Sequence, residues 1–398
     1  MTSSDAAGAA GPHRFPLLDP LRALAAISVL LVHTAIFTGA FDDRYYGRFL
    51  AHLDIGVPFF FLLSAFLLYR PFVEARVTGT PRTRFRDYGK RRFVRIFPAY
   101  WAALTVAAIV PGMAGAFSGN WWVYYGLLQN YPVYEATGTC AVDPFRCGIP
   151  IAWTLSIEVF FYLTLPLFVL AMAWLGERWH GGWLRLELAA VALISAISIV
   201  IQSSVPMDDV HTWLFFSPLG RGWWFGLGLA LAAISVELSH RPTEPAFIDR
   251  VRRHPGVPVL GGALLYALAA IFWFEPSPSL SYPVVDLGHY VALYLLVGVI
   301  AALVILPAVF GADGGGLWRR ALRHRSLVWL GLVSYGIFLW QFPVLIFLLD
   351  ADVDGFLPLT VLTFTLTVGC AALSYYLLER PLMRRLRRRT AVAEPAAG

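Results

Sequence analysis

Runs of apolar residues alternate with short polar segments along the whole chain. Ten runs come close to the length, about 20 residues, that an α-helix needs to cross the hydrocarbon core of a bilayer. They lie at residues 17–37, 55–69, 97–113, 151–175, 186–201, 217–236, 257–275, 286–310, 327–349 and 357–378. We therefore expect an all-α polytopic membrane protein with about ten transmembrane helices. An even number of helices places both termini on the same side of the membrane.

The composition excludes the common classes of soluble protein. Hydrophobic residues make up 58% of the 398 residues and charged residues only 14%, whereas a soluble domain has about 25% charged residues. Ten helices of about 20 residues use half of the chain, so no large soluble catalytic domain fits beside them. Any chemistry is therefore expected within the membrane or at its surface.

The basic residues predict the orientation of the helices. With the N-terminus inside, 26 of the 31 lysine and arginine residues fall on inner segments, and only Arg44, Arg48 and Arg146 fall on outer loops. Inner loops of membrane proteins carry such an excess, so both termini are expected in the cytoplasm. We therefore attribute the net charge of +6 to the orientation of the helices, and no nucleic-acid partner is expected.

The expected organisation is one membrane domain between two tails. Residues 1–16 are expected to form a disordered cytoplasmic tail, residues 17–380 the membrane domain and residues 381–398 a basic cytoplasmic tail. Cys140 and Cys147 lie on the longest outer loop, 114–150, where the sequence leaves open whether they form a disulfide. Cys370 lies in a predicted helix, where we expect it to serve packing.

Two ionisable side chains lie in the first predicted helix. Arg22 and His33 are eleven residues apart, so they share one helix face and lie about 16 Å apart along its axis. Ionisable groups inside a membrane are costly and often functional. Two simpler interpretations remain open: Arg22 extends its head group to the membrane surface, and His33 forms a hydrogen bond between helices.

Further polar residues are expected near His33 in the outer half of the membrane. Counting about 1.5 Å per residue from the predicted helix ends places Arg221, Glu158 and Ser64 in the same layer as His33. A base, an acid, a cation and a hydroxyl in one layer suit acid–base chemistry. The alternative is an ion pair between Glu158 and Arg221 that only fixes helix packing.

A basic cluster precedes the third predicted helix on the inner side. Arg91, Arg92 and Arg95 lie there, and Glu379 closes the last helix on the same side. Arginine forks bind phosphates bidentately, although basic flanks are also what the orientation requires. Phosphate binding inside and acid–base chemistry further out suit a long donor such as acyl-coenzyme A, with His33 taking the proton of an acceptor hydroxyl.

Several motifs together resemble acyltransferase family three, the integral-membrane O-acyltransferases that include bacterial O-antigen acetylases. The resemblance covers the whole membrane region. Its motifs are an Arg-x10-His pair at Arg22 and His33, the segments 56–66 and 153–162, an Arg-x-x-Arg pair at Arg92 and Arg95, the run from Arg221 through Phe225 to Gly228, the segment 334–340, and Glu379-Arg380-Pro381.

The resemblance implies that Arg22, His33, Arg92, Arg95 and Glu379 are important for activity. The chain departs from the family pattern in four places, which are Ala65 for glycine, Thr154 for serine, Phe338 for tyrosine and Gln341 for the histidine of many members. No second proton carrier is therefore expected at position 341. Some members carry an additional hydrolase-like domain outside the membrane, and we expect none here.

These observations assign provisional roles to the site residues. His33 is expected to act as general base or acyl relay, with Arg22 orienting His33 or the donor. Coenzyme A phosphates are expected on Arg91, Arg92 and Arg95, with Glu379 pairing with these arginines. Glu158 and Arg221 are expected to polarise or orient the acceptor. Acceptor or structural positions are Ser64, Trp153, Ser334 and Tyr335. No bound cofactor or metal is expected.

The expected function is acyl transfer from cytosolic acyl-CoA to a hydroxyl of a carbohydrate, glycolipid or secondary metabolite. The expected location is the plasma membrane of a bacterium. An alternative from another class is a secondary transporter or flippase with a proton relay through His33 and Glu158. Transporters often have two repeated halves, and no internal repeat is visible in the sequence. A non-catalytic membrane scaffold is a third interpretation.

Overall fold

The computed structural model describes residues 15–131, 133, 138–204, 212–243, 245–272, 287–311 and 314–392. Within these ranges most of the chain is helical and no strand occurs, only an isolated bridge between Ala114 and Cys147. The expected all-α fold is confirmed. The expected disorder of residues 1–16 falls almost wholly on residues outside these ranges.

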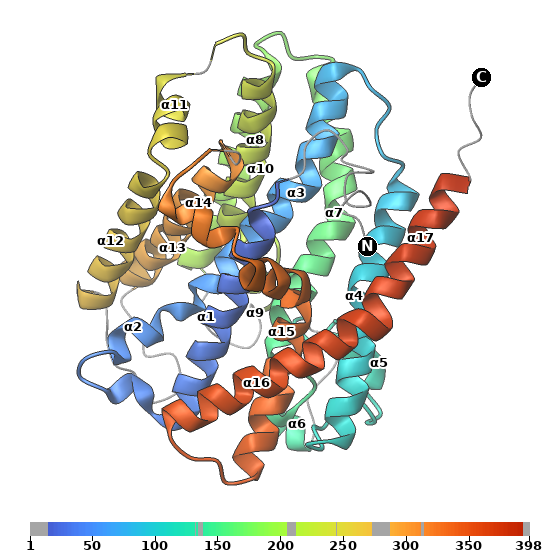
Figure 1. Ribbon diagram of the computed structural model, residues 1–398. Coiled ribbons are helices and arrows are strands. Elements are labelled where there is room, and N and C mark those ends of the chain that lie inside the picture. Colours follow the sequence, from blue (N-terminus) through green and yellow to red (C-terminus); the bar gives the residue numbers. More distant parts are fainter. Residues whose placement is uncertain are drawn as a thin grey trace, which may run out of the picture.

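Ten long helices correspond one by one to the ten predicted runs (Figure 1). They are α1 (Leu18–Thr38), α3 (Gly56–Thr78), α4 (Phe85–Ile109), α7 (Trp153–Gly176), α8 (Trp183–Ser204), α10 (Gly222–Ser239), α12 (Gly256–Phe272), α13 (Leu287–Val309), α15 (Arg325–Asp350) and α16 (Phe356–Ser374). Among the described residues, nine helices are long and apolar enough to cross a membrane. A tenth span is counted when α11 (Ala246–Arg253) and α12, which meet at an angle of 85°, are taken together.

Short elements join the long helices. They are α2 (Gly47–Ala51), α5 (Trp121–Tyr125), α6 (Thr139–Val142), α9 (Thr212–Phe215), α14 (Leu317–Leu322) and α17 (Arg380–Val392), with 3-10 turns η1 (Ala40–Asp42), η2 (Leu53–Ile55), η3 (Pro144–Arg146) and η4 (Pro150–Ala152), and a π-helical turn η5 (Tyr375–Glu379). The segment expected as a C-terminal tail therefore begins as a helix, α17, which continues from α16 through η5.

Two helices extend further than the sequence predicts. Helix α3 continues through Pro71 to Thr78, and α4 begins at Phe85. The predictions ended both helices where charged residues begin, because charge is costly in a membrane. In the structure the charged ends remain helical, so Arg92 and Arg95 lie within α4 and not on a flanking loop.

The centre of the molecule is built from α1, α3, α10 and α15. Helix α1 packs on α15 and α3, and α3 packs on α10. Glycines permit the close approaches: a side-chain carbon placed at Gly331 would lie 2.4 Å from the backbone of Asp19, and one at Gly228 would lie 2.3 Å from the carbonyl oxygen of Leu62. Small residues at such crossings let helix backbones approach closely in membranes.

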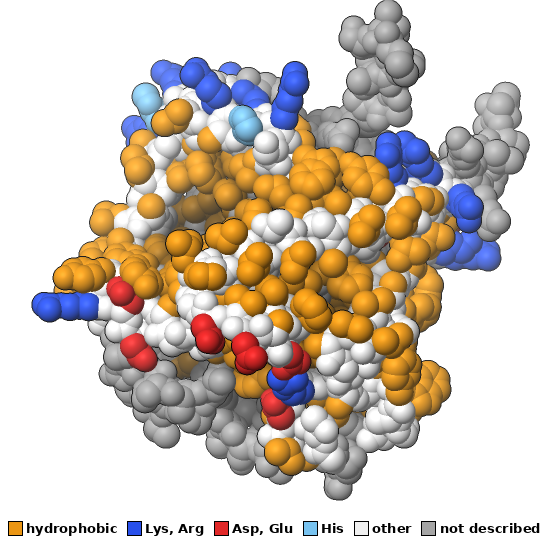
Figure 2. Space-filling view, turned by 60° about the horizontal axis from the view of Figure 1, so that its bottom comes forward, with side chains coloured by type: hydrophobic (Ala, Val, Ile, Leu, Met, Phe, Trp, Pro, Cys, Tyr) orange, Lys and Arg blue, Asp and Glu red, His pale blue; other side chains and the backbone are white. Residues whose placement is uncertain are grey.

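The outer surface is apolar across a broad band. Figure 2 shows hydrophobic side chains covering the middle of the molecule, with most of the basic side chains in view along its upper edge and right side, and acidic side chains below. A band of this kind matches the hydrocarbon core of a bilayer. The structure therefore agrees with a multi-pass membrane protein, while its orientation remains a prediction.

The longest loop is held by a covalent and an ionic link. Cys140 and Cys147 form a disulfide with a Cα–Cα distance of 5.1 Å, which resolves the question that the sequence left open. Arg146 donates a hydrogen bond of 3.0 Å to the carboxylate of Asp350 at the end of α15, and this contact raises the pKa of Arg146. The disulfide closes a short ring within the loop, and the contact between Arg146 and Asp350 holds the loop against the end of α15.

Candidate active site

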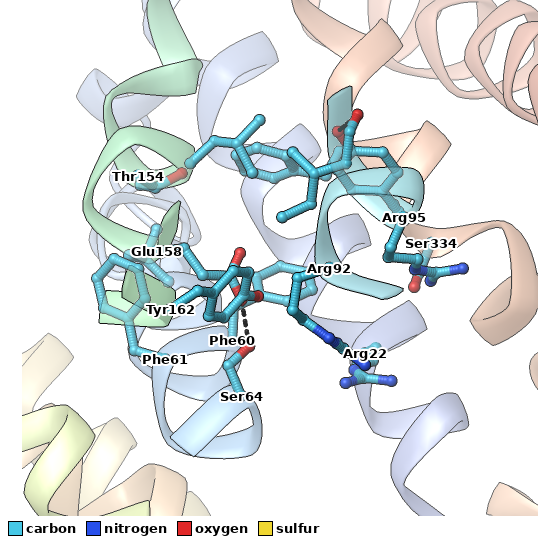
Figure 3. A pocket seen from close by; sticks show the side chains of 15 residues that line it. Arg22, Phe60, Phe61, Ser64, Arg92, Arg95, Thr154, Glu158, Tyr162 and Ser334 are labelled. Atoms are coloured by element: carbon cyan, nitrogen blue, oxygen red, sulfur yellow. Dashed lines mark hydrogen bonds between the residues drawn. The ribbon is translucent and has the colours of Figure 1, made fainter. Parts of the chain in front are cut away.

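Five helices surround one cavity in the middle of the molecule (Figure 3). It receives side chains from α1, α3, α4, α7 and α15. Its polar lining residues are Arg22, Ser64, Arg92, Arg95, Thr154, Glu158, Tyr162, Ser334 and Tyr335. Seven of the twelve residues expected from the sequence thus line a single cavity.

Three arginines form the cationic side of this cavity, opposite the α7 residues in Figure 3. Arg92 and Arg95 are three residues apart on α4, so they project from the same helix face. Arg22 reaches the cavity from α1 and forms an ion pair of 3.2 Å with Asp19. The Nε atom of Arg92 is buried without a hydrogen-bond partner among the described residues, so it is available to an anionic ligand.

Glu379 supports the cationic side from the far end of the chain. Its carboxylate lies 3.4 Å from Arg95 and is almost fully buried. The π-helical turn η5 places Glu379 there, and π turns occur frequently at functional sites. The expected pairing of Glu379 with the arginine cluster is present for Arg95. Arg91 differs from its neighbours, because it is exposed and does not line the cavity.

Glu158 and Ser64 form the opposite side of the cavity. The hydroxyl of Ser64 on α3 donates a hydrogen bond to the carboxylate of Glu158 on α7, drawn as a dashed line in Figure 3. The ring of Tyr162, one helical turn after Glu158, lies 6.0 Å from the guanidinium carbon of Arg92. Acid, hydroxyl and cations thus share one cavity, whereas the sequence placed Glu158 and Ser64 in a layer apart from the arginines.

The error in depth comes from where α3 begins. A side-chain carbon at Gly56 would lie 2.4 Å from the carbonyl oxygen of Ala25 and 2.7 Å from Val29. Gly56 therefore lies beside the middle of α1, because α2 and η2 occupy the outer part of this span. Ser64 is two turns further along α3, which brings it to the level of the arginines and not to that of His33.

His33 lies outside this cavity, on the α1 face that carries Arg22. Its Nδ1 atom lies 3.4 Å from Oε1 of Gln341 on α15, and its ring packs edge-on against Phe342 at 5.5 Å. The Nε2 atom of Gln341 donates to the carbonyl oxygen of Phe338, so its Oε1 faces His33 as an acceptor. This arrangement assigns the hydrogen to Nδ1 and leaves Nε2 of His33 as the basic nitrogen.

Arg221 and Trp153 line a second cavity together with residues of η2, α9, α10 and α13. No ion pair joins Arg221 to Glu158 among the described residues. The ion pair with Arg221, one of the alternatives that the sequence left open for Glu158, is therefore not formed. Glu158 lines the first cavity and Arg221 the second.

Two residues of the site had no role in the sequence analysis. Tyr162 stands within a recognised motif, yet nothing in the sequence places it against Arg92. Gln341 was noted only as a departure from the family pattern. Ser334 and Tyr335 line the cavity as well, and the Tyr335 hydroxyl donates 2.9 Å to the carbonyl oxygen of Ile96. Among the described residues no three His, Cys, Asp or Glu side chains gather into a metal site.

Comparisons with known proteins agree on one family. A family model described as an acyltransferase domain matches residues 16–378. YrhL of Bacillus subtilis, named as a proposed peptidoglycan O-acetyltransferase, is 25% identical over 393 residues. The O-acetyltransferase OatA of Staphylococcus aureus is 23% identical over 397 residues.

These alignments cover most of this chain but only part of each relative. They include 93% and 94% of the chain, which spans 55% of the length of YrhL and 58% of that of OatA. No solved structure matches the chain.

Proposed function

The chain belongs to acyltransferase family three, and from this premise we propose that it is a membrane O-acyltransferase. It moves an acyl group from cytosolic acyl-CoA to a hydroxyl of a carbohydrate, glycolipid or secondary-metabolite acceptor. Its location is the plasma membrane. The names of the relatives make a sugar hydroxyl of a cell-wall polymer the first acceptor to test.

One observation carries the donor assignment. A single cavity collects three guanidinium groups from α1 and α4 against one carboxylate, that of Glu158. Asp19 and Glu379 pair with Arg22 and Arg95 from outside the lining. Arg92, whose Nε has no partner among the described residues, is the cation best placed for an anion, and arginine forks suit phosphate groups. The pyrophosphate and ribose phosphate of coenzyme A provide several such groups at one end of a long molecule.

The acyl end of the donor must then reach His33. The seam between α1 and α15 leads from Arg22 and Ser334, past Phe338, to His33 and Gln341. Eleven residues of α-helix span about 16 Å, a distance that the thin pantetheine arm of coenzyme A can follow. The side chains along this seam are mainly apolar, which suits the arm and excludes water.

The proposed chemistry uses the neutral form of His33. Its Nε2 atom takes the proton from the acceptor hydroxyl while the hydroxyl oxygen attacks the thioester carbonyl carbon. The C–S bond breaks, the acyl group stays on the oxygen as an ester, and the thiolate of coenzyme A takes up the proton from His33. Gln341 holds the imidazole in the required tautomer through Nδ1, and Arg22 orients the donor.

Transfer of labelled acetyl groups tests this function. Membranes that contain the wild-type chain should transfer label from acetyl-CoA to a panel of hydroxyl acceptors, and His33→Ala should lower the rate by about a hundredfold or more, since general-base catalysis contributes 10²–10⁴. The matched control is His180→Ala, which alters an exposed histidine remote from both cavities. A wild-type chain that moves label across the membrane without forming any ester would support a transporter and refute the proposal.

The donor site is tested by coenzyme A binding to the purified chain. Arg92→Ala combined with Arg95→Ala should weaken binding by about a hundredfold or more, because two charged hydrogen bonds are lost and each is worth about 1.5–3 kcal/mol. Arg86→Ala removes an exposed arginine from the same helix and should leave the affinity unchanged. Equal affinity in the double variant and the control would contradict the assignment.

A further inference from the structure

The second cavity has a composition that the donor site does not explain. It is lined by Asp54, Trp153, Arg221, Trp224, Tyr290 and Tyr294, with apolar residues between them. It contains one carboxylate and one guanidinium, so its net charge is zero. A polyanion such as coenzyme A is therefore poorly matched to it, in contrast to the arginine-rich first cavity.

Arg221 is held there in an unusual way. The side chain is only 5% exposed, and its guanidinium carbon lies 4.6 Å from the ring centre of Phe215 and 5.0 Å from that of Trp224. No carboxylate lies within ion-pair distance among the described residues. Aromatic faces stabilise a cation, but they leave its hydrogen-bond donors unused, and the Nε atom has no partner among the described residues.

A hydrogen-bonded network fixes the position of this cation. Nη1 of Arg221 donates 3.4 Å to the hydroxyl of Tyr290, which in turn donates 2.7 Å to Gln202. Gln202 donates to the carbonyl oxygen of Gly220, the residue before Arg221. A buried charge held rigidly in this way is preorganised for a ligand, because little conformational entropy is lost when the ligand binds.

The second cavity adjoins the first. Val57 lines both cavities, and the first residues of α7 divide between them, since Trp153 lines the second cavity and Thr154 the first. Gly56, the residue before Val57, packs against Val29, and His33 lies one helical turn beyond Val29 on α1. The wall between the cavities is therefore close to the proposed base.

We infer that the second cavity is the acceptor subsite and that it binds a neutral, hydroxyl-bearing ring. This inference rests on the proposed function. Asp54 accepts hydrogen bonds from ring hydroxyls, Arg221 donates to ring oxygens, and the aromatic rings pack on the apolar faces of the acceptor. Asp54 was not among the residues that the sequence singled out. Its carboxylate also disfavours acceptors that carry a negative charge.

Direct binding separates this inference from the acyl-transfer proposal. The purified full chain is titrated calorimetrically with a neutral tetramer of β-1,4-linked N-acetylglucosamine, and separately with coenzyme A. Asp54→Asn and Arg221→Gln should each weaken binding of the tetramer by about tenfold, the effect of one lost hydrogen bond to a charged group. Binding of coenzyme A should stay unchanged in both variants. The matched control is Asp42→Asn, an exposed carboxylate in the same loop region.

Charge selectivity provides a second, independent measurement. A tetramer that alternates N-acetylglucosamine with N-acetylmuramic acid carries carboxylates, and the wild type should prefer the neutral tetramer over it. Asp54→Asn makes the cavity cationic, so the preference should shift towards the charged tetramer. Unchanged tetramer affinity in both variants, or wild-type preference for the charged tetramer, would overturn the inference. If the wild-type chain binds the tetramer as predicted but transfers no acetyl group, the result would count against the proposed function and not against this inference.

Discussion

One hydrogen bond determines how the proposed base is presented. Gln341 accepts from Nδ1 of His33 and is itself fixed by the carbonyl oxygen of Phe338. A glutamine is neutral, so it sets the tautomer of the imidazole without placing a negative charge beside the ring. We regard Gln341 as a positioning residue, since it acts on the substrate only through His33.

Two substitutions of Gln341 should therefore separate its effect on the position of the imidazole from the effect of a charge beside the ring. Gln341→Glu places a carboxylate beside the imidazole and stabilises its protonated form, so the acidic limb of the pH–rate profile should move to higher pH. Gln341→Ala should lower kcat by about tenfold, equivalent to 1.4 kcal/mol, and leave the limb in place. Acetyl transfer measured from pH 5 to pH 9 distinguishes the two. An unmoved profile in the glutamate variant would show that His33 is not the titrating base.

The sequence predicted part of this arrangement. The shared face of Arg22 and His33 follows from helical periodicity, which is a local property. The contact between His33 and Gln341 joins residues 308 positions apart, and no periodicity reports such a pair. For the same reason the sequence did not connect Tyr162 with Arg92, although both lie in recognised motifs.

At the scale of elements, α3 lines the first cavity and packs closely on α10. Helix α10 crosses α3 at Gly228, where an added side-chain carbon would lie 2.7 Å from Cβ of Ala65. The family pattern has glycine at position 65, and here alanine takes that place. The remaining glycine, Gly228, therefore provides the space for this crossing on its own.

Gly228→Ala should destabilise the bundle. The new methyl group meets the backbone of Leu62 at 2.3 Å, so the helices must separate, and overpacking of this kind costs about 1–3 kcal/mol. Thermal unfolding of the purified chain, followed by tryptophan fluorescence, should show a lower midpoint. Gly261→Ala on α12 is the matched control, because nothing lies within 4 Å of the added carbon there. Equal midpoints would mean that α3 and α10 separate without cost.

Element boundaries explain the main error of the sequence analysis. The existence and order of the ten long helices were predicted, because apolar runs of this length have few other solutions. The depth of residues in the second span was not predicted, because α2 and η2 share this span with α3. A break inside a span changes the level of the residues that follow it in that span, and so Ser64 was placed apart from the arginines.

The distribution of basic residues gives a separate prediction, which is the orientation of the whole molecule in the membrane. Single cysteines introduced at two exposed sites test it, Arg44→Cys on a predicted outer loop and Arg86→Cys on the predicted inner side. A maleimide that does not cross membranes should label only Arg44→Cys in intact cells, because the positive-inside rule places Arg86 in the cytoplasm. Both sites should react after the cells are opened. Labelling of Arg86→Cys alone in intact cells would show that the orientation is the reverse of the predicted one.

Val57 lines both cavities, so the proposed donor and acceptor subsites meet at this side chain. A donor from one compartment and an acceptor from the other could then exchange a small chemical group without either of them crossing. In the proposed reaction the acyl group and the hydroxyl proton move in opposite directions, so each turnover is electrically neutral.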